Sequence, residues 1–448
     1  MSLKKKATKG SIWTSLTRTG INVVDFLVYA YLARVLTLEE FGLAGFCFLF
    51  IEFANTLVNA GVNQNLVQRD KWEDRYAAST MTFVAGMGLV VVIGILGIGA
   101  PIAYYSYSEL AAWVVASLAP ITLVTSLQVV VSGKLLREFK NKQMGIAKFC
   151  ATLISAATII VLAESGYGLW SLIIGKLVNA IIQYILLIYV AKFKPYFHFN
   201  REDNKELIRD SHKGALVINQ VTMSSINSMV VPSFSRVKKR DDLGNLFIKM
   251  VTITALLVLP IFMGLAAVAD PFVTIAFGDK FAPSAEFMAI SAFTMFPGVV
   301  AWFLPNLLIA SGKTNDAFKL TLLNLISNIL VAGATIWFGI KFMLISLVVA
   351  SFISLPIRIF IVNKHVSIDS KRLFSSLVPP SFSALSMYFL LIAIKPHITN
   401  WVNSDVLSLI LLIASGALIY PFMYITLFFG HAKVQLNELK EMLASKKR

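Results

Sequence analysis

The sequence predicts an all-α polytopic membrane protein whose helices fall into two sets, one of six and one of six or seven. The first reason is a series of apolar runs without Asp, Glu, Lys or Arg, at residues 76–108, 110–133, 287–312, 320–340, 373–394 and 406–430. A helix needs about 20 apolar residues to cross a hydrocarbon core of about 30 Å. The second reason is composition, because 57% hydrophobic and 14% charged residues leave too little polar surface to cover a soluble globule.

Hydropathy predicts the helices in order along the chain, six on each side of a polar connector. We expect them at 14–34, 41–62, 80–104, 111–133, 144–163 and 168–191, and then at 246–269, 286–311, 318–338, 342–362, 373–394 and 405–429. These ranges predict four parts. They are an N-terminal six-helix lobe (1–195), a cytoplasmic connector (196–213), a C-terminal helical lobe (214–430) and a basic cytoplasmic tail (431–448).

The positive charges predict the orientation of these helices. If the N-terminus is inside, most of the 40 Lys and Arg residues fall in cytoplasmic loops, while the exceptions Arg34, Lys280, Lys341 and Lys395 fall outside. This asymmetry is typical of multi-pass membrane proteins. We therefore expect both termini in the cytoplasm. The lysines of residues 1–10 precede no small-residue cleavage site, so this stretch is expected to anchor the first helix and not to be a removable signal peptide.

The segment 214–235 does not fit this scheme. It is long enough to cross the membrane, but basic clusters flank both of its ends and several Asn, Gln, Ser and Thr residues lower its hydropathy. A single crossing would place one basic loop on the wrong side. Three interpretations compete: a re-entrant or interfacial helix, a true span that tolerates one misplaced loop, or the remnant of a pair of spans from which one has been lost.

Several predicted helices carry polar residues three or four positions apart, and such residues share one helix face. The stripes are Arg18, Asn22 and Asp25; Glu52, Asn55, Asn59 and Asn63; Lys176, Asn179 and Gln183; and Thr321, Asn324 and Asn328. A charged group at membrane depth costs about 3 kcal/mol or more unless it is paired or hydrated. We therefore expect the stripes to face other helices or a water-filled cavity.

Each charged member of these stripes has two interpretations. Arg18 and Lys176 either attract an anionic head group or extend to the nearby cytoplasmic interface. Asp25 either takes up a proton or sodium ion or forms an internal ion pair with Arg18 that only fixes helix packing. For Glu52 we favour ion coupling, because its neighbours in its own helix include no cation.

The sequence argues against an enzyme. The five His residues lie in loops or tails without a zinc-binding spacing, and no nucleotide-binding glycine loop is present. We expect no catalytic residues, no metal site and no cofactor. The basic residues lie in short loops between apolar spans without interleaved aromatic residues, so we do not expect nucleic-acid binding. A membrane enzyme acting on glycans would need a sizeable outer loop rich in acids or bases, and the longest, about 269–285, has only three charged residues.

Six phrases along the chain resemble the polysaccharide transporter (O-antigen flippase) family of the multidrug, oligosaccharidyl-lipid and polysaccharide exporter superfamily. They are MSLKKKATKGSIWTSL, LARVLTLEEFGLAGF, NAGVNQNLVQRD, GYGLWSLIIGKLVNAI, LAAVADPFVTIAFGDKFAPS and LIASGKTNDAFKL. The resemblance implies a protein of the bacterial inner membrane with two helical bundles around a central cationic cavity. It also implies movement of undecaprenyl-pyrophosphate-linked oligosaccharides by alternating access, and partners such as membrane lipids, a glycan polymerase and a chain-length regulator.

Within that resemblance the candidate residues receive roles. Arg18 and Lys176 would hold the pyrophosphate, and the asparagines 22, 55, 59 and 179 would bind sugar hydroxyls. Relatives usually carry a further helix before the stretch that resembles VVPSFSRVKKRDDLGNLF, and here about 40 residues, about one span, are expected to be missing. This departure favours the third interpretation of 214–235. The alternatives are a cation-coupled exporter of small molecules or drugs, and a transport-deficient remnant of the family.

Overall fold

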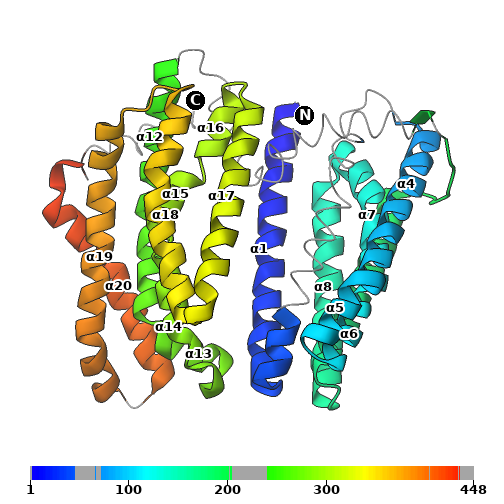
Figure 1. The fold of residues 1–448 in the computed structure, drawn as a ribbon, viewed down its shortest axis with the longest axis horizontal. Coiled ribbons are helices and arrows are strands. Elements are labelled where there is room, and N and C mark those ends of the chain that lie inside the picture. The colour runs from blue at the N-terminus through cyan, green and yellow to red at the C-terminus, as the bar shows by residue number, and fades with distance from the viewer. Residues whose placement is uncertain are drawn as a thin grey trace. The chain divides into compact units, whose positions relative to one another are not determined.

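The computed structural model describes residues 3–45, 66, 72–200, 202–203, 240–402, 404–431 and 433. Within these ranges every regular element is a helix, so the all-α prediction is confirmed. The chain divides into two compact units, Met1–Ser225 and Ile226–Arg448, and each is described by itself (Figure 1). In the described ranges nine helices are long and apolar enough to cross a membrane, and a bent pair of helices would add a tenth. The prediction of a multi-pass membrane protein is confirmed.

The described part of unit 1 consists of long and short helices that pack against one another. They are α1 (Leu3–Val35), α4 (Asp74–Gly94), a π-helical turn η1 (Ile95–Gly99), α5 (Ala100–Ser106), α6 (Glu109–Ala116), α7 (Leu118–Arg137), α8 (Asn141–Glu164) and α9 (Leu169–Ala191). Helix α7 packs against α4 and α9, and helix α8 packs against α1 and α9. Two apolar clusters form the core, one around Leu32, Leu118 and Leu169 and the other around Met81 and Leu135.

Local sequence signals explain where these helices begin and bend. Thr37 and Glu40 form a reciprocal capping box: the Thr37 backbone N–H donates to Glu40 Oε2 at 2.9 Å, and the Glu40 N–H donates to Thr37 Oγ1 at 3.2 Å. A new helix therefore starts at Leu38. The π-helical turn η1 ends at Gly99, two residues before Pro101, which cannot donate a backbone hydrogen bond and would clash with the carbonyl four residues earlier, that of Gly97 within the turn.

Unit 2 is built around α12 (Arg240–Ala267), on which Phe247, Leu259 and Met263 are fully buried. The elements that follow are α13 (Ala269–Phe277), η2 (Asp279–Phe281), α14 (Ser284–Ala292), α15 (Met295–Ala301), α16 (Leu304–Ala310), α17 (Thr314–Thr335), η3 (Ile336–Phe338), α18 (Ile340–Asn363), α19 (Ser370–Trp401) and α20 (Asp405–Leu427). Helix α12 packs on α19, α19 packs on α20, and α17 packs on α18.

One predicted helix, 286–311, is broken in the structure. Helix α14 meets the α15–α16 segment at a bend of 45°. The breaks follow from Pro297 and Pro305, because proline cannot donate to the carbonyl four residues earlier, and these carbonyls belong to Phe293 and Ala301 at the two helix ends.

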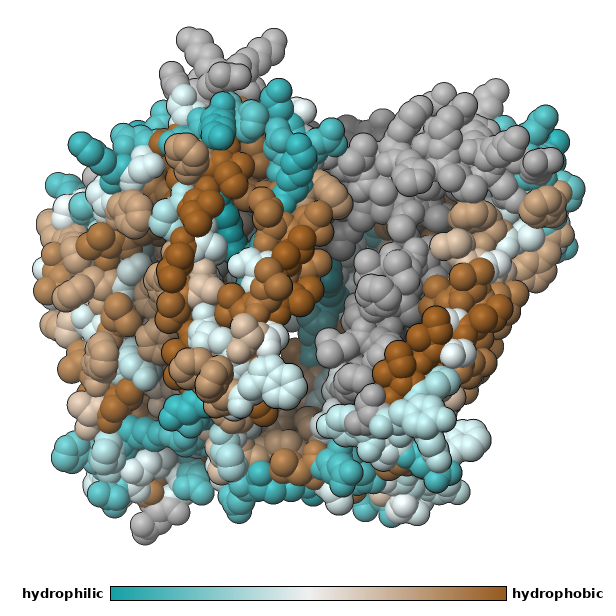
Figure 2. All heavy atoms as spheres, in the orientation of Figure 1, coloured by the Kyte–Doolittle hydropathy of each residue, from teal (hydrophilic) through white to brown (hydrophobic). Residues whose placement is uncertain are grey.

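The surface of the helices is apolar between hydrophilic ends. Figure 2 shows this for unit 2, where hydrophobic side chains cover the middle of the helices and hydrophilic ones gather at both ends. Large exposed residues such as Leu330, Ile353 and Phe360 belong to this band. An exposed apolar band of this kind is stable only in lipid. Most of the predicted helix 41–62 and all of the segment 214–235 lie outside the described residues.

Candidate functional site

The polar residues of unit 1 meet where α1 and α9 lie against α8. Lys176 Nζ on α9 donates to Asp25 Oδ1 on α1 at 3.1 Å. The two side chains are 24% and 35% exposed, so the pair is accessible from one side. The structure thus gives Asp25 a partner on another helix, which the spacing along the first helix, with Arg18 as the candidate partner, does not indicate.

Small residues bring these helices close enough for the pair to form. A Cβ atom on Gly175 of α9 would lie 2.1 Å from Ile159 Cγ1 of α8, and one on Gly145 of α8 would lie 2.6 Å from Thr17 Oγ1 of α1. Ser155 Oγ also donates to the Gly175 carbonyl at 2.8 Å. Close packing through glycine and serine is typical of helices in membranes. It fixes the positions of α1 and α9 relative to α8.

The surroundings of the pair are cationic and aromatic. Lys176 Nζ lies 5.5 Å from the centroid of the Tyr29 ring, one helical turn beyond Asp25 on α1. Lys148 on α8 is close enough to Arg18 for their like charges to interact. Lys148 was not among the predicted site residues, although it lies four residues inside its own predicted helix. Three cations thus lie on α1, α8 and α9, namely Arg18, Lys148 and Lys176, and Lys176 pairs with the acid Asp25.

The remaining predicted site residues have different outcomes. Arg18 and Asn22 are exposed on α1, and Asn179 is partly buried on α9, one turn from Lys176. Glu52, Asn55 and Asn59 lie outside the described residues. The roles assigned to all eight residues stay predictions.

A second polar contact lies in unit 2. Arg358 on α18 donates from Nη2 to Asn324 Oδ1 on α17 and to Ser354 Oγ on its own helix. The polar stripe of α17 is visible in the sequence, but the count of positive charges does not distinguish Arg358 from the cytoplasmic cations that follow it. Its position inside the predicted helix 342–362 was the signal that could have identified it.

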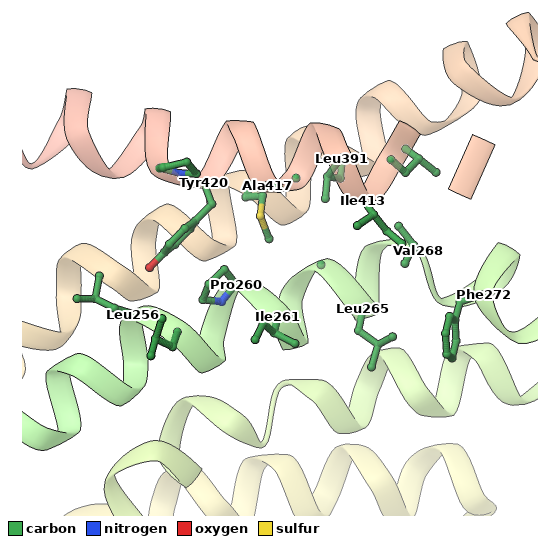
Figure 3. Close-up of a pocket in the computed structure, with 16 residues that line it drawn as sticks. Leu256, Pro260, Ile261, Leu265, Val268, Phe272, Leu391, Ile413, Ala417 and Tyr420 are labelled. Carbon is green, nitrogen blue, oxygen red and sulfur yellow. The ribbon is translucent and has the colours of Figure 1, made fainter. Parts of the chain in front are cut away.

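An apolar groove in unit 2 was not predicted. It has a volume of about 630 Å³ and lies between α12, α13, α19 and α20 (Figure 3). Its lining includes Leu256, Pro260, Ile261, Leu265, Val268, Phe272, Leu391, Ile413, Ala417 and Tyr420. Among the described residues, the Tyr420 hydroxyl is buried without a hydrogen-bond partner. The groove suits a flexible apolar chain, because pockets of this composition bind mainly by excluding water.

In the ranges that the structure describes, no three His, Cys, Asp or Glu side chains are grouped so that they could hold a metal ion. The site chemistry therefore consists of the ion pair and its cationic surroundings, the Arg358 contact and the apolar groove.

Comparison with known proteins gives relatives along much of the chain. The succinoglycan biosynthesis transport protein ExoT of Rhizobium meliloti (strain 1021) is 24% identical over 346 residues, with 68% of this chain and 69% of the relative covered. The lipopolysaccharide biosynthesis protein WzxC of Escherichia coli (strain K12) is 22% identical over 367 residues, with 71% and 73% covered. Each alignment has more positions than the number of residues of this chain that it covers. The additional positions are residues of the relative that have no counterpart in this chain.

The fold is also similar to a solved structure. The lipid II flippase MurJ in its inward closed conformation matches with a TM-score of 0.72 at 14% identity, covering 94% of this chain and 99% of that chain. MurJ is a transporter built from two helical bundles, so the prediction of a helical fold with two bundles is confirmed, while the predicted number of helices in each bundle stays a prediction. The transporters among these relatives also confirm the expectation that the chain is not an enzyme.

The family described as "Polysaccharide biosynthesis protein" matches residues 31–217 and 209–286, which is more than half of the chain. The two matched segments meet at the connector, next to the place where a helix is expected to be missing. The predicted resemblance is confirmed, and the chain belongs to this family of polysaccharide biosynthesis proteins.

Proposed function

We propose that this protein moves lipid-linked oligosaccharide repeat units across the bacterial inner membrane, for the synthesis of O-antigen, capsule or exopolysaccharide. The observation that carries the proposal is the family match, together with relatives named for succinoglycan transport and lipopolysaccharide biosynthesis. The lipid carrier is undecaprenyl pyrophosphate, whose charge and attached sugars cannot cross a hydrocarbon core unaided. Each unmatched hydroxyl would cost several kcal/mol in lipid.

The polar residues of unit 1 support this proposal. Arg18 and Lys176 supply positive charge for a pyrophosphate, and Lys148 adds to it. The asparagines 22 and 179 offer donors and acceptors for sugar hydroxyls, and asparagines 55 and 59 are proposed to join them. A cation-coupled drug exporter is less consistent with these residues, because a cationic substrate favours acids and aromatic faces.

The contact between Asp25 and Lys176 suggests how substrate binding could be linked to an ion. With Asp25 ionised, its carboxylate neutralises Lys176 at 3.1 Å. A proton or sodium ion on Asp25 would release Lys176 to bind the pyrophosphate, and loss of that ion would return Lys176 to the carboxylate. Binding of anion and cation would then be positively coupled. Glu52 is proposed as a second coupling acid.

The groove of unit 2 is proposed to hold part of the isoprenoid tail. Its lining is almost entirely apolar, and its only polar hydroxyl in the described lining belongs to Tyr420. A Cβ atom on Gly264 of α12 would touch only Met387 Cε, at 3.7 Å, so a larger side chain there would project into free space. Filling this space should therefore hinder the tail more than it disturbs the helix.

A genetic assay tests the proposal in cells. A strain that lacks its own flippase should regain surface polysaccharide when it carries this chain, and its cytoplasmic pool of lipid-linked repeat units should fall. We expect Gly264→Leu to weaken complementation. Gly333→Leu should leave it unchanged, because a Cβ atom added to Gly333 would meet no atom of a neighbouring residue within 4 Å. Restored resistance to cationic drugs without restored polysaccharide would instead support the drug exporter.

A second candidate is a transport-deficient member of the family. It is favoured by the two-segment family match and by the residues of the relatives that find no counterpart here. If one helix has been lost at the start of the second lobe, the chain would keep its fold and lose complementation. We place the termini in the cytoplasm for either candidate, and a glycan polymerase and a chain-length regulator remain proposed partners.

A further inference from the structure

We propose that Arg358 is a phosphate-binding residue of unit 2. Its guanidinium has hydrogen-bond donors available for a lipid-linked phosphate or pyrophosphate. The identity of the ligand rests on the proposed function, but the existence of an anion site rests on the geometry of α17 and α18. Nothing in the family match or the relatives assigns a role to this residue.

Arg358 has only neutral hydrogen-bond acceptors in the described part of the chain. Both of its bonds start at Nη2: one reaches Asn324 Oδ1 across to α17, and the other reaches Ser354 Oγ at 2.8 Å. No carboxylate in the described ranges pairs with it. A guanidinium carries five N–H donors, so the three on Nη1 and Nε have no acceptor among the described residues. This is the fork that binds a phosphate through two parallel bonds.

The direction of the side chain argues against simple extension to the membrane interface. Arg358 lies five residues before Asn363, where α18 ends, so its Cα is about 8 Å inside that end. Ser354 lies one turn further from this end, so the guanidinium bends away from the near interface. An arginine that extends to water would point the other way. The two neutral acceptors therefore hold the charge inside the helical region.

The charge requires a counter-ion. An arginine without a counter-ion at membrane depth is energetically costly, and neutral acceptors offset only part of this cost. Thr321 and Asn328 lie one turn before and one turn after Asn324 on α17, and both are exposed. An anion bound at Arg358 would thus have hydroxyl and amide groups beside it, as a phosphate attached to a sugar requires.

Binding measurements on the full chain in nanodiscs of zwitterionic lipid test this proposal without any transport. The probe is undecaprenyl pyrophosphate, with uncharged undecaprenol as the reference for binding by the tail alone. We expect Arg358→Gln to weaken pyrophosphate binding about tenfold or more, since a hydrogen-bonded charge is lost. Binding of undecaprenol should not change. Lys364→Gln, which removes one exposed cation just beyond the same helix, is the matched control and should bind like the parent.

A second variant keeps Arg358 but makes its guanidinium unavailable to an external anion. Asn324→Asp places a carboxylate where the neutral acceptor now lies, so the guanidinium gains an internal counter-ion and should lose the external one. We expect this variant to bind pyrophosphate more weakly than the parent while its melting temperature stays equal or rises. Parent-like affinity in folded Asn324→Asp, or in folded Arg358→Gln, overturns the proposal.

Phosphatidylglycerol as a competitor separates the two sources of a phosphate group. If phosphatidylglycerol displaces undecaprenyl pyrophosphate from the parent but not from Arg358→Gln, Arg358 forms an anion site that also binds membrane phospholipids. If it does not compete, the site at Arg358 prefers undecaprenyl pyrophosphate to phospholipids. The outcome is independent of the proposed function. A chain that binds pyrophosphate through Arg358 without complementing a flippase mutant would refute transport and retain the site.

Discussion

The ion pair between Asp25 and Lys176 joins α1 to α9, and under the proposed function the same contact would also serve transport. Each side chain alone would be an uncompensated charge among apolar helices, and together they neutralise each other. The same contact places the candidate ion-coupling acid on the candidate pyrophosphate ligand. Neither group can change its charge without affecting the other.

A double-mutant cycle on this pair measures that dependence. We expect Asp25→Asn and Lys176→Gln each to lower stability by about 1–3 kcal/mol, because each removes the opposite charge from a half-buried partner. The double variant should lose less than the sum, with a coupling energy of about 1–3 kcal/mol. Unfolding in mixed micelles gives these values. Asp270→Asn is the control, since Asp270 is 71% exposed in its pair with Lys395 and should cost under about 1 kcal/mol. Additive losses at Asp25 and Lys176 would contradict a coupled pair.

At the scale of the helices, glycine contacts decide how α1, α8 and α9 pack. Gly175 on α9 has no room for a Cβ atom, because Ile159 of α8 lies 2.1 Å from where it would be. By contrast, a Cβ atom on Gly94, at the end of α4, would have no other atoms within 4 Å. Two glycines in apolar helices are therefore expected to respond differently to the same substitution.

We expect Gly175→Ala to lower the melting temperature, with a loss of about 1–3 kcal/mol for an overpacked contact. Gly94→Ala should be neutral or slightly stabilising, since alanine favours the helix. Thermal unfolding of the two variants beside the parent checks this. Equal melting temperatures for all three chains would show that α8 and α9 do not pack as described.

The sequence predicts the positions of the helices better than it predicts the contacts between them. Apolar length is set locally by the need to cross the membrane, so helices such as 144–163 and 168–191 match α8 and α9 closely. The bend in 286–311 was not predicted, because a proline in an apolar run can also leave a helix continuous with only a kink. The partner of Asp25 could not be predicted, because periodicity relates residues of one helix and Lys176 lies on another. The apolar groove gives no sequence signal, since its residues resemble those that face lipid.

At the scale of the whole molecule, the two compact units of apolar helices belong to a chain of the polysaccharide biosynthesis protein family. The charge pattern predicts cytoplasmic termini, and the family match supports a transporter. The central claim is that this chain itself carries a lipid-linked glycan across a bilayer.

Translocation in proteoliposomes tests this claim most directly. A fluorescent lipid-linked oligosaccharide is placed in both leaflets, and a membrane-impermeant quencher added outside reports how fast the inner pool becomes accessible. We expect transport well above the rate in protein-free vesicles, with a slower rate for Lys176→Gln than for the parent. A parent rate equal to that of protein-free vesicles, with the chain folded and correctly inserted, would contradict the claim.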